Sequence, residues 1–101
     1  MLTATLTVPE ALQIIIYIDT MKESDRDPLH SLGLSIEQAL RRTGLDDSAI
    51  FDVEHDEALE EKALERLFSQ IEIEEGEEPA EGSISFTVSD REKDAILAEA
   101  I

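Results

Sequence analysis

The sequence LTATLTVPEALQIIIYIDTMK, residues 2–22, contains a strand pattern that runs directly into a helix pattern. Its first part alternates apolar residues with threonines, which is typical of a strand with one buried and one polar face. Its second part is rich in isoleucine, a β-former, but its polar residues recur at helical spacing: Glu10, Gln13, Tyr17 and Thr20. Between the two parts, Thr7 and Pro9 match a helix start. We expect a strand over residues 2–8 and a mostly buried helix over residues 9–22.

The same order recurs near the other end of the chain. Residues 83–88 alternate serine or threonine with apolar residues, which predicts a second half-buried strand. Ser89 and Glu92 then have the spacing of a capping box, in which each residue satisfies a backbone N–H of the other at a helix start. The sequence therefore contains two weakly similar strand–helix units, residues 2–22 and 83–101.

The segments that follow the first unit are less regular. Residues 24–33 include an Asp-Pro pair and predict a loop. Ser35 then caps a short helix over residues 36–43, which Gly44 ends. Residues 49–55 alternate over a short length, and their pattern fits either a strand or a helix.

The third quarter of the chain predicts a helix and a strand. Residues 57–70 form a helical pattern with one apolar face: Leu64, Leu67, Phe68 and Ile71. Residues 71–74 alternate again and predict a strand that pairs with residues 83–88. Together the patterns predict an α+β fold in one domain, residues 1–101. We expect a small antiparallel sheet of three to four strands, with helices packed on one face and a Thr/Ser face open to water or to a partner.

Composition and charge exclude several classes of protein. There is no cysteine, which excludes disulfides, thiolate metal sites and cysteine nucleophiles. The first residues lack the features of a signal peptide, and the longest apolar run, residues 14–18, is too short to span a bilayer. A net charge of −17 predicts repulsion from nucleic acids and from anionic membranes. We therefore expect a cytoplasmic protein that binds neither directly.

No residue pattern predicts catalysis, a cofactor or a metal site. The two histidines are His30 and His55, too few for the metal centre of a phosphohydrolase. The serines lie outside any nucleophile motif, and the glycines do not form a phosphate loop. Residues 46–57 have the length and acidic ends of a calcium-binding loop, but Phe51 stands where such a loop requires glycine. We expect a non-enzymatic protein without a cofactor.

The negative charge is concentrated in one part of the chain. Residues 44–81 hold 15 of the 25 acidic residues and two basic residues, so they carry −13 of the net −17. Within the predicted helix, Glu57, Glu61 and Glu65 are about 6 Å apart along the axis. We hypothesise that the carboxylates imitate nucleic-acid phosphates and dock into the basic groove of a nucleic-acid-binding protein, such as a CRISPR or restriction effector. The predicted partner-binding residues are Glu54, Asp56, Glu57, Glu60, Glu61, Glu65, Glu72, Glu74, Glu75, Glu77, Glu78 and Glu81.

In size and acidity the chain resembles the small inhibitors made by phages and mobile elements, including some anti-CRISPR and anti-restriction proteins. The resemblance lies in composition and in no motif, so it assigns no site residue. It implies an inhibitor that acts in the cytoplasm of a host cell.

Other interpretations of the charge remain open. The acidic surface can merely solubilise an accessory or structural protein that is recognised through its sheet. Halophilic proteins are also acidic, although their charge is expected to spread over the whole surface. A homodimer through a sheet edge is a further alternative, but two chains of −17 repel each other and would need a neutral contact surface.

Overall fold

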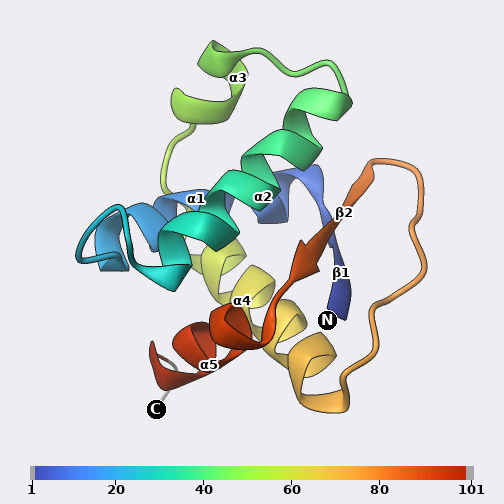
Figure 1. Ribbon diagram of the computed structural model, residues 1–101. Helices are drawn as coiled ribbons and strands as arrows, with labels where there is room; N and C mark the ends of the chain where they lie inside the picture. The colour runs from blue at the N-terminus through green and yellow to red at the C-terminus, as the bar shows by residue number, and fades with distance from the viewer. Residues whose placement is uncertain (1, 100–101) are drawn as a thin grey trace.

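Two antiparallel strands, β1 (Leu2–Thr7) and β2 (Ser83–Val88), bring distant parts of the chain together (Figure 1). The computed structural model describes residues 2–99, and the register runs from Leu2 opposite Val88 to Thr7 opposite Ser83. Five helices complete the described part: α1 (Val8–Met21), α2 (Pro28–Arg42), α3 (Asp47–Phe51), α4 (Glu57–Ile73) and α5 (Asp90–Glu99). The predicted α+β class is confirmed.

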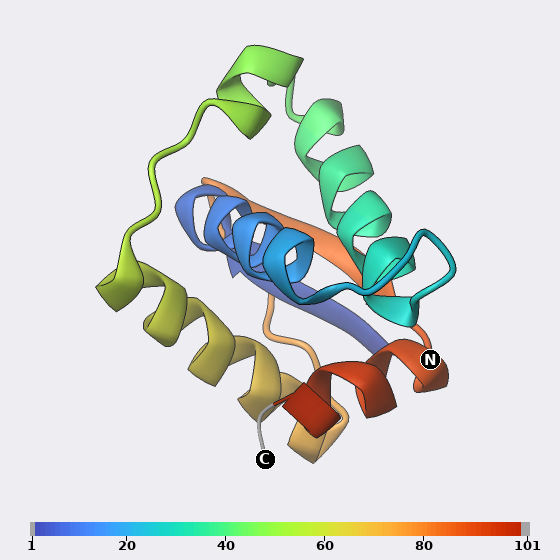
Figure 2. The same cartoon turned by 90° about the vertical axis from the view of Figure 1, so that its left-hand side faces the viewer.

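The helices pack against one face of the sheet. Alternate residues of both strands enter the core: Leu2, Ala4, Leu6, Ile84, Phe86 and Val88. Helix α1 lies over this face, with α2 on the side of β2 and α4 on the side of β1 (Figure 2). Ala11, Ile14 and Ile18 of α1 are buried between them. This burial on helical spacing explains why the isoleucine-rich segment forms a helix in spite of its β propensity.

Both strands lead into capped helices, as predicted. The Thr7 N–H donates to the Glu10 carboxylate at 2.9 Å, and the Glu10 N–H donates to the Thr7 hydroxyl at 3.3 Å. The Ser89 N–H donates to the Glu92 carboxylate at 2.8 Å, and the Glu92 N–H donates to the Ser89 hydroxyl at 3.2 Å. Each pair is a capping box that fixes where its helix begins.

The predicted third strand over residues 71–74 is wrong. Residues 71–73 form the last turn of α4, where Ile71 is buried and Ile73 is 65 % exposed. The outer edge of β1 is occupied by a side chain instead. The Thr5 N–H donates to the Gln70 amide oxygen at 2.8 Å, and the Gln70 amide nitrogen donates to the Thr5 carbonyl at 2.8 Å. Gln70 thus makes the two bonds of a neighbouring strand, and the described sheet has two strands instead of three to four.

Helix α2 begins earlier than predicted. Residues 24–33 were expected to form a loop, with a helix start at Ser35, but α2 starts at Pro28. The Asp27 carboxylate accepts the Leu29 N–H at 2.9 Å and caps the helix. Proline suits the first turn because its missing N–H would have no partner there. The Asp-Pro pair therefore marks a helix start, and Leu29, Leu32 and Ile36 bury one face of the helix.

The ambiguous residues 49–55 contain the end of the short helix α3, followed by an irregular connection to α4. The Asp46 carboxylate caps α3 and the Asp56 carboxylate caps α4, so both acidic groups serve helix termini.

Within residues 2–99, no group of three His, Asp or Glu side chains is arranged to hold a metal ion. None of the helices in this range is long and apolar enough to cross a membrane.

Candidate functional site

Helix α4 carries the most regular part of the negative charge. Its inner side is buried through Ala63, Leu67 and Ile71. Four exposed glutamates share the other side, within an arc of about 80° at 3.6 residues per turn. These residues, here called the α4 stripe, are Glu57, Glu61, Glu65 and Glu72. The α4 stripe extends about 22 Å along the helix axis at 1.5 Å per residue.

The segment 74–82 continues the acidic surface from the end of α4 toward β2 (Figure 1). Glu74 ends the helix in a left-handed conformation with φ 55°. The Glu77 N–H donates to the Gln70 amide oxygen at 3.1 Å, and the Glu77 carbonyl accepts the Thr5 hydroxyl at 2.8 Å. Backbone and side-chain bonds therefore fix the course of this segment against β1.

Gly76 lets the same segment lie directly on β1. A Cβ atom at position 76 would stand 1.8 Å from the Thr3 carbonyl oxygen, so only glycine fits there without movement of the backbone. The segment covers Thr5, which is 1 % exposed, whereas Thr3 and Thr87 are exposed. The Thr/Ser face that was predicted to be open is therefore closed at Thr5.

Arg66 of α4 is engaged by two carboxylates. Its guanidinium donates to Glu10 of α1 at 2.7 Å and to Glu77 at 2.5 Å. The Glu10 side chain is 3 % exposed. Burial raises the pKa of Glu10, but its hydrogen bonds with Thr7 and the charge of Arg66 together hold the pKa below its ordinary value of 4.5. Arg66 is therefore not available to neutralise the α4 stripe.

The structure separates the twelve predicted partner-binding residues into two groups. Four have other contacts: Asp56 caps α4, Glu60 pairs with His55 at 2.5 Å, Glu74 pairs with Lys93 at 3.2 Å, and Glu77 pairs with Arg66. The other eight are exposed and have no ion-pair partner within residues 2–99: Glu54, Glu57, Glu61, Glu65, Glu72, Glu75, Glu78 and Glu81. These eight residues, here called the unpaired acidic surface, are free to meet an external cation.

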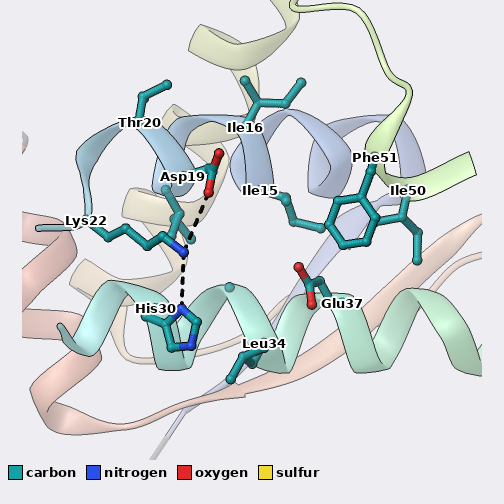
Figure 3. Close-up of a pocket in the computed structure, with 12 residues that line it drawn as sticks. Ile15, Ile16, Asp19, Thr20, Lys22, His30, Leu34, Glu37, Ile50 and Phe51 are labelled. Atoms are coloured by element: carbon teal, nitrogen blue, oxygen red, sulfur yellow. Dashed lines mark hydrogen bonds and ion pairs between the residues drawn. The ribbon is translucent and has the colours of Figure 1, made fainter. Parts of the chain in front are cut away.

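A second surface feature is an apolar cleft of about 210 Å³ between α1, α2 and α3 (Figure 3). Its apolar wall includes Ile15, Leu34, Ile50 and Phe51. At one end, Lys22 Nζ lies 3.6 Å from the Asp19 carboxylate and 3.3 Å from His30 Nδ1. Lys22 thus contacts both Asp19 and His30, whereas Glu37, which also lines the cleft, has no ion-pair partner within residues 2–99. The cleft can therefore receive an apolar group and presents the Glu37 carboxylate beside it.

Sequence reasoning did not find the cleft. It depends on α2 starting at Pro28 and on α3 being helical, and neither was predicted. Phe51, which is 54 % exposed, was the one signal available, because a large aromatic residue stood in a segment without a clear pattern.

Comparison with protein-family models, with curated proteins and with solved structures finds no match to this chain. The chemistry of the site therefore has to be inferred from its own residues.

Proposed function

We propose that this protein is a non-enzymatic binding protein that places its unpaired acidic surface in the basic groove of a nucleic-acid-binding protein and blocks that groove. The observation that carries the proposal is the α4 stripe, four exposed carboxylates on one side of a regular helix. A CRISPR or restriction effector in the cytoplasm of a host cell is the kind of partner that this chemistry suits, because its groove is lined with lysine and arginine.

The spacing of the carboxylates supports this function and sets a limit on it. Successive members of the first three are about 6 Å apart along the axis. One strand of duplex DNA carries a charge about every 3.4 Å. The α4 stripe alone is therefore sparser than DNA, and Glu75, Glu78 and Glu81 of the segment 74–82 must add to it. Release of counterions from both surfaces would favour docking at low salt.

The fixed course of the backbone also supports the proposal. Helix α4 is anchored by Ala63, Leu67 and Ile71, and the segment 74–82 is held at Gly76 and Glu77. A flexible acidic tail loses conformational entropy when it binds, whereas a fixed array has already lost it. The backbone that carries these carboxylates can therefore meet a groove with little reorganisation.

Capture from a cell lysate tests the proposal. The full chain is immobilised at low salt, bound proteins are eluted stepwise with NaCl, and the eluted proteins are identified by mass spectrometry. We expect nucleic-acid-binding proteins that elute early and that compete for the chain with added duplex DNA. Reversal of two charges, Glu61→Lys with Glu65→Lys, should weaken binding by about 100-fold at low salt.

The matched control is Glu23→Lys with Glu99→Lys, which changes the net charge equally at two exposed positions away from α4, one in the connection between α1 and α2 and one in α5. The proposal requires this control to bind nearly as well as the unaltered chain. Equal loss in both double variants would show a nonspecific effect of net charge. Binding that survives high salt and the reversal at 61 and 65 would favour an accessory protein recognised through another surface.

A further inference from the structure

The two edges of the sheet differ in their hydrogen bonding. Thr5 gives both of its backbone groups to Gln70, so Thr5 and the opposite residue, Ser85, form a pair that is not hydrogen-bonded across the sheet. Bonded and non-bonded pairs alternate along an antiparallel ladder. The backbone groups of Ser85 and Thr87 therefore point away from β1. Within residues 2–99, these N–H and C=O groups have no hydrogen-bond partner.

A hollow of about 150 Å³ lies along this open edge of β2. The polar side of α2 lines it with Ser35, Gln38 and Arg42, and the sheet lines it with Thr3, Ser85, Phe86 and Thr87. No carboxylate is among these residues, and Arg42 is the one charged residue among them. In a chain with a net charge of −17, this is a surface that an uncharged strand can approach without repulsion.

We propose that a second copy of this chain binds here, with β2 against β2 in antiparallel orientation. A strand edge is self-complementary under a two-fold axis, because each donor of one copy meets an acceptor of the other. The added strand, Ser83–Val88, contains no charged residue and no proline. The dimer has one continuous antiparallel sheet in the order β1-β2-β2-β1, and the exposed edge that invites nonspecific pairing is removed.

The distribution of charge favours a second copy as the occupant. Helix α4 flanks β1, on the side of α1 opposite to α2 (Figure 2), so two copies joined at β2 keep their α4 stripes far from the contact. Repulsion over such distances is screened at physiological salt. The proposal does not depend on the function proposed for the unpaired acidic surface.

Arg42 gives the contact a specific charge pair. It lies in the last turn of α2 and lines the hollow with Ser85, whereas Pro28 at the start of the same helix lies with Ser89, beyond the end of β2. Arg42 has no ion-pair partner within the described residues. Antiparallel addition directs the end of the other copy's β2 toward Arg42, and Asp90 follows that end after Ser89. The Asp90 side chain is 81 % exposed and lies 3.3 Å from Lys93 of its own helix, so Arg42 would share this carboxylate with Lys93. The two-fold axis makes this contact twice, once on each side.

Sedimentation velocity of the full chain tests the proposal at concentrations up to about 1 mM. We expect a dimer that strengthens as NaCl is raised, because salt screens the repulsion between the two chains. Ser85→Pro removes an N–H that the β1–β2 ladder does not use, and proline is tolerated at a strand edge. It should raise the dimer dissociation constant by at least about tenfold. Ser85→Ala keeps the N–H, loses the same hydroxyl, and should still dimerise.

Two further measurements test the dimer contact without Ser85→Pro, in case that variant does not fold. In the unaltered chain, the amides of Ser85 and Thr87 should exchange rapidly when dilute and slowly when concentrated, while the Phe86 amide stays protected. Arg42→Glu should weaken the dimer about tenfold more than Arg41→Glu, which makes the same charge change at a residue paired with Asp47 outside the hollow.

Three results would overturn the proposal. The first is a monomer at all concentrations and salt levels, with the Ser85 and Thr87 amides always exposed. The second is a dimer that is equally stable in Ser85→Pro, in a sample where protection of the Phe86 amide shows that the variant is folded. The third is slow exchange of these two amides only when a different protein is added, which would assign the edge to a heterologous strand.

Discussion

Glu10 and Glu92 occupy the same position in two capping boxes but have different surroundings. Each accepts the backbone N–H of its cap residue, and each has a second carboxylate oxygen, Oε2, that is buried without a hydrogen-bond partner. Glu10 also meets the guanidinium of Arg66, which reaches it from α4. The Glu10 box therefore links two helices, whereas the Glu92 box acts within its own helix.

This difference predicts unequal effects of one substitution. Glu10→Gln keeps the cap but removes the charge that Arg66 meets, and should lower the free energy of unfolding by about 1.5–3 kcal/mol. Glu92→Gln is the matched control and should change it by about 0.5 kcal/mol or less. Urea denaturation at pH 7 measures both values. Equal effects would contradict the assignment of the charge pair as the main contribution of Glu10.

The pKa of Glu10 adds a pH dependence to this prediction. It lies below 4.5 in the folded chain, so the Glu10 charge stabilises the fold fully above about pH 5. That contribution is lost as the pH falls through the folded pKa. The difference in unfolding free energy between the unaltered chain and Glu10→Gln should therefore be constant above about pH 5 and shrink in more acidic buffer.

At the scale of elements, what the sequence could predict was local. The capping boxes, the alternation of both strands and the apolar face of α4 depend on residues within a few positions of each other, and these predictions are confirmed. The number of strands depends on a contact between Gln70 and Thr5, 65 positions apart. A single glutamine in a helix gives no signal that it will take the place of a strand.

In the candidate site, too, features set by nearby residues could be predicted, and features set by contacts between elements could not. Exposure of Glu57, Glu61 and Glu65 followed from helical spacing, because residues at i, i+4 and i+8 share a side. Glu72 was expected in a strand, and its place on the α4 stripe appears only in the structure. The pairing of Arg66 with Glu10 and Glu77 could not be predicted, since those residues lie on other elements. The apolar cleft and the open edge of β2 depend on how whole elements pack.

A substitution at Gln70 tests whether its side chain takes the place of a neighbouring strand at the edge of β1. Gln70→Glu keeps the size of the side chain but replaces the group that donates to the Thr5 carbonyl by a buried carboxylate. We expect a loss of about 2–4 kcal/mol at pH 7, with partial recovery in acid when the carboxyl group regains a proton to donate. Urea denaturation at pH 7 and in acid measures this loss of unfolding free energy. The control Ser69→Glu adds the same charge at an exposed neighbouring position and should have little effect; a similar loss there would contradict the role of Gln70.

At the scale of the whole molecule, charge opposes the fold that packing stabilises. The chain has 25 acidic and 8 basic residues, and much of the excess lies on α4 and the segment 74–82. Like charges on a compact surface repel, and added salt screens that repulsion. The core of aliphatic side chains contributes independently of charge.

Thermal melting in dilute buffer and in molar NaCl distinguishes a fold that its core stabilises against charge repulsion from a halophilic protein that needs salt to fold. We expect a folded chain in dilute buffer whose melting temperature rises in salt by about 4–8 °C for each kcal/mol of repulsion that is screened. Near-ultraviolet circular dichroism of Tyr17, which is buried, reports the packed state. A chain that is unfolded until molar salt is added would instead be a halophilic protein.

The pairing of Leu2 with Val88 joins residues 86 positions apart, which has a consequence for how the chain is made. A ribosome makes β1 before β2, so β1 cannot pair until the 75 residues between the two strands, 8–82, have also been made. Closing so long a loop is slow, because its entropy is lost before the ladder forms. Until then the nascent chain exposes its isoleucines, and the dense negative charge of its later residues keeps unfinished copies apart.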